Sequence, residues 1–349
     1  MIKKVSFNRF WKNSNDAAMS NKLPLRIMLE LTYRCNFKCK HCYIPESYRK
    51  KSTEKELKTR EVFSILDQIA DMGCMYLGIS GGEPFLRKDI LNIISYAKMK
   101  GFIIVIYTNG SLITENIARA LKVTKPYKLD ITLPGMSKSV FEWITGVPGS
   151  RARVFNAIGS LSKKKLRVAF KSCVLKQNIS EIKDIYNFTA SLKAQYRIDG
   201  FISPCIDGSS GNHKYRVSVN EISFLDSSLL KNTDCKLSHT QYRDKSHLFS
   251  CGAGFSRATI NPYGQLRICT FIDYPRYGIL NSSFREKWHK LNKLMNEIGR
   301  KNNNFKCIDC ELKSRCTWCP AQSWIRNSTF SPCIDEFKQL AKYRILSAN

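Results

Sequence analysis

The feature that most constrains the fold is a regular alternation of short β-type runs and amphipathic helical runs, which starts near residue 25. Strands are predicted at Arg26–Leu31, Met75–Ile79, Phe102–Tyr107, Lys128–Leu133, Arg167–Leu175 and Arg197–Ser203. Helices are predicted from an N-cap at Thr59 to a stop at Gly73, at Ile90–Lys100, and near Thr114–Leu121, Arg151–Lys164 and Glu181–Lys193. Serial β–α units predict a parallel sheet with outer helices. Because six units fall two short of a full barrel, we expect a partial (β/α)6 TIM-like barrel of the α/β class.

The chain changes character after about residue 205, where Ser, Asn, Asp and Lys become frequent and cysteines cluster towards the end. Its 349 residues suggest two domains, on a soft prior of about 150 residues each. We expect a basic N-terminal extension at 1–24, a barrel at 25–210 and a small cysteine-rich domain at 211–349. The boundary is predicted within Pro204–Asn220.

The predicted cellular compartment indicates what the 14 cysteines do. The N-terminal sequence MIKKVSFNRFWKN has no apolar core of a signal peptide. The longest apolar run, Phe102–Tyr107, is far short of the ~18 residues that span a bilayer. We therefore expect a cytoplasmic protein with no membrane partner. Disulfides are rare in that reducing environment, so most of the cysteines are predicted to be metal ligands.

Three cysteines, Cys35, Cys39 and Cys42, follow the first predicted strand in the sequence LTYRCNFKCKHCYIP. Three thiolates on one loop can hold three irons of a [4Fe–4S] cluster and leave the fourth iron open for a reaction. Two alternatives are buried, inert cysteines and a zinc knuckle with His41 as the fourth ligand. The polar setting of the loop fits both of them poorly.

A second motif, Gly81-Gly82-Glu83-Pro84, follows the second predicted strand. In barrel enzymes the site gathers at the C-terminal ends of the strands, so this motif and the cysteine loop are expected at one site. Glycines let the backbone close on a ligand, and a carboxylate accepts hydrogen bonds from an ammonium group.

Together, the CxxxCxxC and GGEP motifs resemble those of the radical S-adenosylmethionine (SAM) superfamily, over roughly Arg26 to Ser203. The resemblance implies a [4Fe–4S] cluster on Cys35, Cys39 and Cys42, whose open iron binds the amino and carboxylate groups of SAM. Reductive cleavage of SAM would then give methionine and a 5′-deoxyadenosyl radical that abstracts hydrogen from the substrate. The three cysteines are thus the expected catalytic residues.

The resemblance also implies a set of cofactor contacts. Glu83 of the GGEP motif would accept from the SAM ammonium, with Gly81, Gly82 and Pro84 forming the same turn. His41 would contact adenine through its backbone. Thr132, in DITLPG, matches a polar residue near the methionyl group or ribose. Thr108 and Asn109, in YTNG, face the same mouth or form an ordinary β-to-α turn.

The C-terminal part holds a second set of cysteines: Cys251, Cys269, Cys307, Cys310, Cys316, Cys319 and Cys333. This set resembles the SPASM domain, which carries auxiliary iron–sulfur clusters, and Asn261–Gly264 is predicted to be the turn of a hairpin that delivers Cys269. By resemblance, two auxiliary [4Fe–4S] clusters are expected. One would use Cys307, Cys310, Cys316 and Cys333, and the other Cys251, Cys269 and Cys319, with Cys235 as a fourth ligand or an open iron.

One spacing departs from the family pattern, since Cys316 and Cys319 are separated by two residues rather than three. A pair of zinc sites remains the alternative for the second set. Of the other cysteines, Cys74 and Cys173 are expected in the core. Cys205 is expected to face the cavity, as a catalytic or an inert thiol.

Radical SAM–SPASM proteins mostly modify peptides, and TGVPGS (Thr145–Ser150) with ISPCIDG (Ile202–Gly208) looks most like that branch, related to the pyrroloquinoline-quinone precursor cyclase. The main hypothesis is therefore an oxidoreductase of the peptide maturase or cyclase type, whose auxiliary clusters accept an electron from a peptide or protein substrate. About 25 residues precede the first strand, so no fused peptide-recognition domain is expected. A separate recognition protein or direct substrate binding would replace it, and flavodoxin or ferredoxin would supply electrons.

Three other functions stay open. The same motifs permit a radical SAM enzyme of haem-like or other cofactor biosynthesis. The net charge of +29 suggests an RNA-modifying enzyme, but an aromatic-rich RNA-recognition motif is lacking, so the charge favours an acidic peptide or partner over nucleic acid. A non-catalytic iron–sulfur electron carrier would leave GGEP unexplained.

Overall fold

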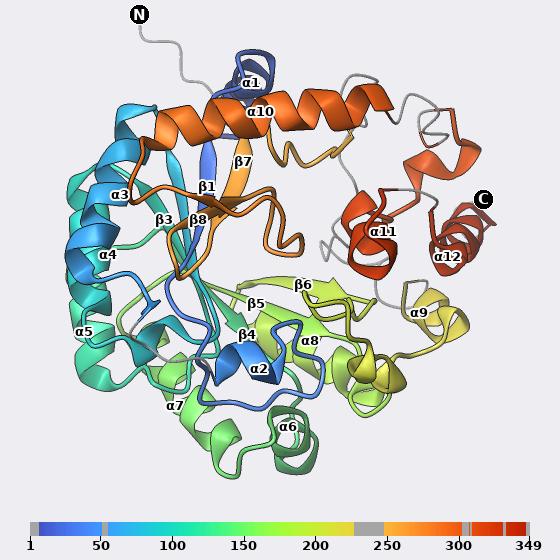
Figure 1. The fold of residues 1–349 in the computed structure, drawn as a ribbon. Coiled ribbons are helices and arrows are strands. Elements are labelled where there is room, and N and C mark those ends of the chain that lie inside the picture. The colour runs from blue at the N-terminus through green and yellow to red at the C-terminus, as the bar shows by residue number, and fades with distance from the viewer. Residues whose placement is uncertain are drawn as a thin grey trace, which may run out of the picture.

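A single sheet organises the protein, and its first six strands are parallel. The computed structural model describes residues 7–50, 55–226, 248–301, 307, 309–330 and 333–346. The parallel strands are β1 (Arg26–Glu30), β2 (Tyr76–Ser80), β3 (Ile103–Thr108), β4 (Lys128–Thr132), β5 (Val168–Cys173) and β6 (Gln195–Asp199). They lie in the order β6-β5-β4-β3-β2-β1 and curve into an open barrel (Figure 1). The predicted partial (β/α)6 barrel is confirmed.

Amphipathic helices cover the outside of this barrel. They are α3 (Thr59–Asp71), α4 (Ile90–Met99), α5 (Glu115–Thr124), α6 (Lys138–Thr145), α7 (Ser150–Lys163) and α8 (Ile182–Ser191). In α3 the residues that repeat at helical spacing, among them Val62, Leu66 and Ile69, are fully buried. They join the strand side chains in one core, which explains why the periodicity of the sequence predicted these helices.

Some local predictions need correction. Helix α3 has Lys58 rather than Thr59 at its N-cap, because the Thr59 hydroxyl donates to Asp89 Oδ2 at 2.7 Å instead of capping its own helix. Helices α1 (Phe7–Ser20), α2 (Glu46–Arg49) and α6 were not predicted. The N-terminal part was expected only as a basic extension. Instead it contains helix α1, and the Arg26 guanidinium carbon lies over the ring of Trp11 in that helix, 4.8 Å from the ring centroid.

The sheet continues beyond β1 with strands from the C-terminal half of the chain. Strand β7 (Arg257–Ile260) pairs parallel to β1, and β8 (Gln265–Arg267) and β9 (Tyr277–Gly278) follow antiparallel. The predicted hairpin turn at Asn261–Gly264 is confirmed, with Gly264 at φ +71°, a conformation that favours glycine. The sequence alone did not predict that this hairpin extends the barrel sheet.

Further helices carry the chain from the β1 side of the sheet round to the β6 side. These are α10 (Phe284–Lys301), α11 (Pro320–Asn327) and α12 (Asp335–Leu346), and α12 packs against α9 (Val219–Leu225) (Figure 1). Gln322 donates to Ser203 Oγ at 2.7 Å, and the rings of Phe201 and Phe337 lie 4.2 Å apart. The C-terminal segment therefore covers the open side of the barrel next to β6.

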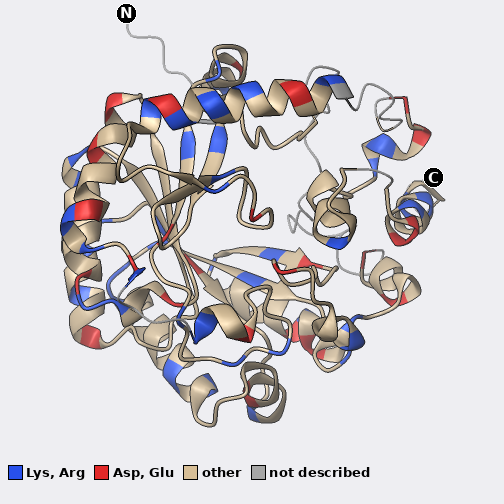
Figure 2. Cartoon of the chain, viewed as in Figure 1, with Lys and Arg blue, Asp and Glu red and all other residues tan. Residues whose placement is uncertain are grey.

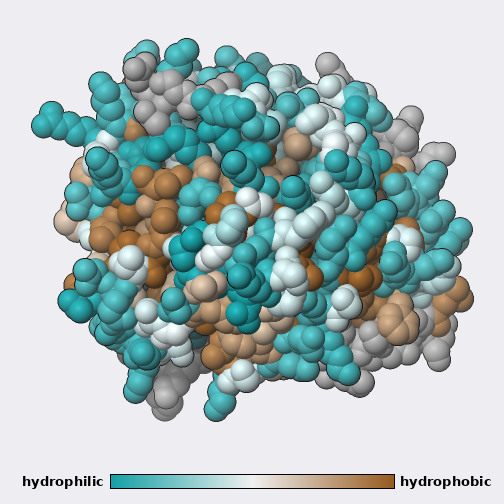
Figure 3. Space-filling view, turned by 90° about the horizontal axis from the view of Figure 1, so that it is seen from below, coloured by the Kyte–Doolittle hydropathy of each residue, from teal (hydrophilic) through white to brown (hydrophobic). Residues whose placement is uncertain are grey.

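The surface carries its charge broadly. Lysines and arginines are distributed over the helices and loops around the whole outline rather than along one stripe (Figure 2). Seen from below, hydrophobic residues occur in separate groups divided by hydrophilic ones (Figure 3). In the described part of the chain, every helix is too short or too polar to cross a membrane.

A buried ion network joins β1 to the hairpin. Glu30, the last residue of β1, and Arg267 of β8 are both fully buried and form an ion pair. Arg267 also donates to Asp273 at 3.1 Å, and Tyr33 donates to Glu30 at 3.1 Å. Burial lowers the pKa of a guanidinium, but Glu30, Tyr33 and Asp273 together raise the pKa of Arg267. The network thus holds charged groups in the interior by mutual compensation.

The substitution Arg267→Met should lower the free energy of unfolding by about 3–5 kcal/mol, because it leaves Glu30 buried without a counter-charge. Urea denaturation measures the loss. The double variant Glu30→Leu/Arg267→Met should recover most of it, and Arg276→Met, which removes a largely exposed partner of Asp273, should cost less than about 1 kcal/mol. A double variant as unstable as the single one would contradict the compensation argument.

Candidate active site

A cavity of about 380 Å³ lies where the strands of the barrel end. Nine of the predicted site residues of the barrel line it: Cys35, Cys39, His41, Cys42, Gly81, Gly82, Thr108, Asn109 and Thr132. Its far wall comes from the C-terminal half, through Phe271, Thr317, Cys319, Gln322, Phe337 and Arg344. A cavity of this size suits a cofactor or small substrate. The structure therefore brings the two N-terminal motifs together, as the β–α order predicted.

The cysteine loop is held by helix α6. Lys38 N–H donates to Thr145 O at 2.8 Å, and Lys40 N–H donates to Ile144 O at 2.9 Å. Both acceptors are carbonyls at the C-terminal end of α6, where a helix leaves carbonyls without intrahelical partners. The loop thus gains a fixed backbone although it contains no regular secondary structure around the thiols. This contact was not predicted, because α6 itself was not predicted.

The protonation of the three thiols depends on whether a metal is bound. Burial raises the pKa of Cys35 to about 12 and also raises the pKa values of Cys39 and Cys42. They therefore stay protonated until a metal supplies positive charge, since coordinating thiols lose their protons. In the described residues, no three potential ligands converge on a single ion. A [4Fe–4S] cluster does not need such convergence, because each cysteine binds a different iron.

The two glycines of GGEP let the loop after β2 touch the loop after β1 backbone to backbone. Gly82 N–H donates to Thr32 O at 2.7 Å, and Glu83 N–H donates to Arg34 O at 2.9 Å. A Cβ on Gly81 would lie 2.1 Å from Thr32 O, and a Cβ on Gly82 would lie 2.2 Å from Arg34 O. Only glycine permits this approach, which fixes the residues immediately before the cysteines.

Glu83 and Pro84 do not line the cavity. The Glu83 carboxylate is fully buried and accepts from Thr108 Oγ1 at 2.8 Å, Asn109 N–H at 2.7 Å and Phe85 N–H at 3.1 Å. Burial raises the pKa of Glu83 to about 7, although these three hydrogen bonds act in the opposite direction. In this structure, Glu83 ties the end of β3 to the GGEP loop.

Asn109 connects that same strand end to the cysteine loop. Its amide donates to Asn36 Oδ1 at 2.9 Å and approaches Cys35 Sγ at 3.8 Å, and its own oxygen accepts from Ser111. Nearby, burial and, to a lesser degree, Lys171 lower the pKa of His41 to about 4, so its imidazole is neutral. His41 Nδ1 is buried without a hydrogen-bond partner in the described part of the chain.

Several residues of the cavity wall were not predicted as site residues. Lys171 and Cys173 of β5 and Asp199 of β6 all line it. Cys173 was expected in the core, but as the residue two beyond Lys171 it shares the cavity face of β5. A lysine inside the otherwise apolar run of β5 was the available signal. Cys205 was expected to face the cavity, but it is not among the residues that line it, and its Sγ donates to Cys42 O at 3.4 Å.

Some of the C-terminal cysteines lie close to one another. Cys251 lies close enough to Cys269 to influence its titration. Cys310 and Cys316 both influence Cys333 in the same way. Cys319 lies in the wall of the large cavity, and Cys307 lies in the short described stretch after α10. All of these are free thiols, and Cys235 lies outside the described residues.

Comparison with known proteins identifies the barrel. Residues 29–189 match the model of the radical SAM superfamily. They form a radical SAM domain. The chain is therefore a radical SAM enzyme, and this domain implies a [4Fe–4S] cluster and bound SAM.

Relatives of this radical SAM enzyme have more than one described role. It is 25% identical over 334 residues to the AdoMet-dependent heme synthase of Methanosarcina barkeri, covering 88% of this chain and 94% of that protein. It is 26% identical over 295 residues to the antilisterial bacteriocin subtilosin biosynthesis protein AlbA of Bacillus subtilis, covering 81% and 63%.

Among solved structures, Streptococcus suis SuiB bound to the precursor peptide SuiA superimposes with a TM-score of 0.69. The sequences are 15% identical over 95% of this chain and 81% of SuiB. At this identity the likeness concerns the fold, and it extends over the barrel and the cysteine-rich C-terminal half together.

The substitution Gly82→Ala should lower the free energy of unfolding by about 1–3 kcal/mol or more, because the new Cβ meets the Arg34 carbonyl. Thermal unfolding and the iron content after cluster reconstitution both report the effect. The matched control is Gly159→Ala in α7, where a Cβ has no neighbour within 4 Å and helix propensity favours alanine. Equal stability of the two variants would rule out the close approach of the loops.

The buried Glu83 predicts a specific pH dependence. Its folded pKa of about 7 lies above the usual 4.5, so the folded state holds the proton more tightly than the unfolded state. The resulting stability is complete below pH 4.5 and is lost as the pH rises through 7. Relative to Glu83→Gln, the wild type should lose about 3 kcal/mol between pH 4.5 and 8, measured by urea denaturation across that range. Parallel pH profiles for the two proteins would contradict this.

Proposed function

We propose that this radical SAM enzyme oxidatively modifies a peptide or protein substrate. The observation that carries the proposal is the composite cavity, in which the thiols of the radical SAM loop face a wall built by the cysteine-rich C-terminal half. Cys319 lies in that wall, and Phe271 lies two residues beyond Cys269. A substrate held between the two walls would contact the radical site on one side and, on the other, the cysteine-rich wall that would accept an electron.

The residues of the barrel side have separable tasks. When bound, the cluster and SAM supply the 5′-deoxyadenosyl radical that removes a hydrogen atom from the substrate. Cys35, Cys39 and Cys42 would hold the cluster, and Gly81 and Gly82 would let SAM approach the backbone. Thr108, Asn109, Thr132 and His41 would complete the SAM site, with Glu83 fixing the loop beneath it. The packed wall excludes water from the reacting atoms.

The C-terminal cysteines would hold two auxiliary [4Fe–4S] clusters. Cys251, Cys269 and Cys319 would bind the one nearer the cavity, and the other would be bound by Cys307, Cys310, Cys316 and Cys333. In this arrangement the substrate would give up one hydrogen atom at the radical site, and the nearer cluster would accept a further electron while a proton leaves to solvent. The resulting oxidation matches what a peptide cyclase or thioether-forming maturase requires. Flavodoxin or ferredoxin would supply the reducing electron, and a separate recognition protein could present the peptide.

The lining of the cavity favours a peptide over a tetrapyrrole. Ser203, Thr317 and Gln322 offer neutral donors and acceptors of the kind that pair with a peptide backbone. A tetrapyrrole precursor carries several carboxylates and calls for several free cations. Of the basic residues in the described wall, Arg344 donates to Asp226 at 2.6 Å and the His41 imidazole is neutral, which leaves Lys171 as a single cation rather than several. The similarity to a heme synthase keeps haem-type chemistry as the second candidate.

An anaerobic assay with SAM and reductant tests both candidates. A deuterated candidate precursor peptide should transfer deuterium to 5′-deoxyadenosine, detected by mass spectrometry, whereas a deuterated tetrapyrrole should not. Transfer from the tetrapyrrole alone would replace peptide maturation with haem-type chemistry.

The same assay tests the proposed cluster ligands. Cys35→Ala, Cys39→Ala and Cys42→Ala should each abolish release of 5′-deoxyadenosine, because the cluster loses a ligand. Cys74→Ala is the matched control, since that thiol is buried and contacts the Leu25 and Tyr76 carbonyls. Release by the triple cysteine variant would refute the proposed site.

A further inference from the structure

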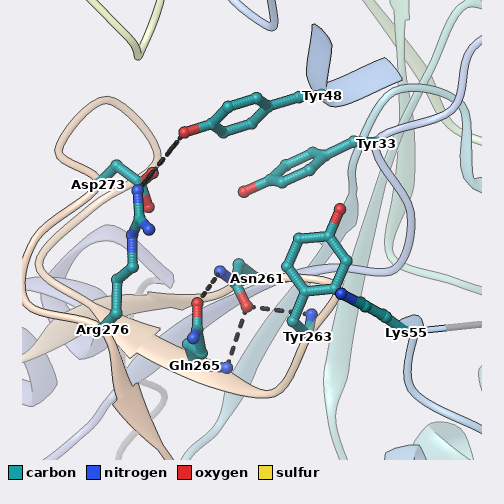
Figure 4. A pocket seen from close by; sticks show the side chains of 8 residues that line it. All are labelled: Tyr33, Tyr48, Lys55, Asn261, Tyr263, Gln265, Asp273 and Arg276. Atoms are coloured by element: carbon teal, nitrogen blue, oxygen red, sulfur yellow. Dashed lines mark hydrogen bonds and ion pairs between the residues drawn. The ribbon is translucent and has the colours of Figure 1, made fainter. Parts of the chain in front are cut away.

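We infer that a second cavity, between α2 and the β7–β8 hairpin, binds a carboxylate side chain of the peptide substrate, an inference that rests on the proposed function. The cavity measures about 420 Å³ and is separate from the radical SAM cavity. Figure 4 shows Tyr33 and Tyr48 on one side and Asn261 and Gln265 on the opposite side, with Lys55 next to Tyr263 and with Arg276 pointing toward Asp273.

Three tyrosine rings give this cavity an apolar wall. The rings of Tyr33 and Tyr48 lie 5.6 Å apart between centroids, and those of Tyr33 and Tyr263 lie 5.9 Å apart. Tyr33 is fixed by its hydrogen bond to Glu30, and Tyr48 by its hydrogen bond to Asp273 at 3.0 Å. Rigid aromatic faces of this kind suit the methylene stem of a side chain and cost little conformational entropy on binding.

The side-chain oxygens of Asn261, Gln265 and Asp273 already accept hydrogen bonds. Asn261 Oδ1 accepts from two backbone N–H groups at 3.0 Å, and Gln265 Oε1 accepts from Asn261 Nδ2 at 2.8 Å. Asp273 accepts from Arg267, Arg276 and Tyr48. By contrast, Lys55 Nζ and Gln265 Nε2 have no acceptor among the described residues. A ligand that satisfies this cavity must therefore bring acceptors.

The charges lead to the same class of ligand. Burial alone would raise the pKa of Asp273, but Arg267 and Arg276 hold it below its usual range, so this carboxylate is ionised and compensated. Glu30 compensates Arg267, and Glu56 is paired with Arg34 at 3.4 Å. Among the described residues that line this cavity, Lys55 is the cation without a carboxylate partner. A glutamate or aspartate side chain would pair with Lys55 and place its stem on the tyrosines.

The ion network links the second cavity to the radical SAM cavity through shared side chains. Tyr33 lines the second cavity and Tyr43 lines the radical SAM cavity, and both interact with Glu30. The two cavities thus lie on either side of one rigid group of side chains. An acidic residue held at Lys55 would tether the peptide while another residue enters the barrel, which raises the local concentration of the reacting segment.

The test uses the cluster-loaded enzyme and three short probes: acetyl-leucyl-glutamyl-leucine amide, its glutaminyl counterpart, and the glutaminyl peptide with a free C-terminus. Saturation-transfer NMR titrations give their Kd values for the wild type, Lys55→Gln and the matched control Lys58→Gln. The glutamyl amide should bind at least fivefold more tightly than the glutaminyl amide. Lys55→Gln should remove that preference, and Lys58→Gln, an exposed lysine outside the cavity, should keep it.

The outcomes separate this inference from the proposed function. Equal affinities of the two amide probes, or equal losses in the two lysine variants, overturn the carboxylate site. Tight, Lys55-dependent binding of the free C-terminus alone would overturn the assignment to a carboxylate side chain and would give the site to a terminal carboxylate instead. A Lys55-dependent preference together with no deuterium transfer from any peptide would reject peptide maturation and keep the anion site.

Discussion

The backbone contact between the first two strand-end loops is the constraint on which the candidate site depends. Gly81 and Gly82 allow the GGEP loop to hydrogen-bond directly to the Thr32 and Arg34 carbonyls, within a distance that any side chain would prevent. Cys35 follows immediately, so its position is set by main chain rather than by flexible side chains. Glu83 then secures the contact from beneath by accepting from the end of β3. Two motifs that lie about 45 residues apart in the sequence are therefore held rigidly together by backbone hydrogen bonds. This contact is the physical reason why a cysteine loop of this kind needs a glycine pair after the next strand.

A second constraint joins this unit to the C-terminal half. The Glu30–Arg267 pair sits at the end of β1, on the opposite side of the cysteine loop from GGEP, and both residues are fully buried. Buried pairs of this kind add little net stability compared with apolar residues, but they penalise any arrangement that separates them. The hairpin that carries Arg267 leads directly to Cys269 and Phe271. One ion pair therefore fixes the distance between the barrel and the cysteines of the far wall, and it also orders the tyrosines of the second cavity.

Much of the barrel could be predicted from the sequence because its elements are set by local periodicity. The strands β1 to β6 and their helices appear within a few residues of their expected positions, with β6 starting two residues earlier than predicted. Helix α6 was not predicted, because the segment Thr145–Ser150 at its end was interpreted as a family motif rather than as the end of a short amphipathic helix. The pairing of β7 with β1 could not be predicted, since a register between strands more than 200 residues apart depends on tertiary packing and leaves no local pattern.

The chemistry of the site was predictable at the level of motifs but not of side-chain direction. Strand alternation decides direction, and it turns Lys171, Cys173 and Thr132 toward the cavity while the intervening residues enter the core. In the loop after β2, the buried Glu83 carboxylate accepts hydrogen bonds from Thr108 and two backbone N–H groups. An acidic residue next to a glycine pair can therefore act indirectly, by fixing the conformation of the loop that carries the glycines. In the described wall of the cavity, a ligand meets the neutral His41 imidazole together with Lys171 and Asp199, so charged groups of both signs line the site.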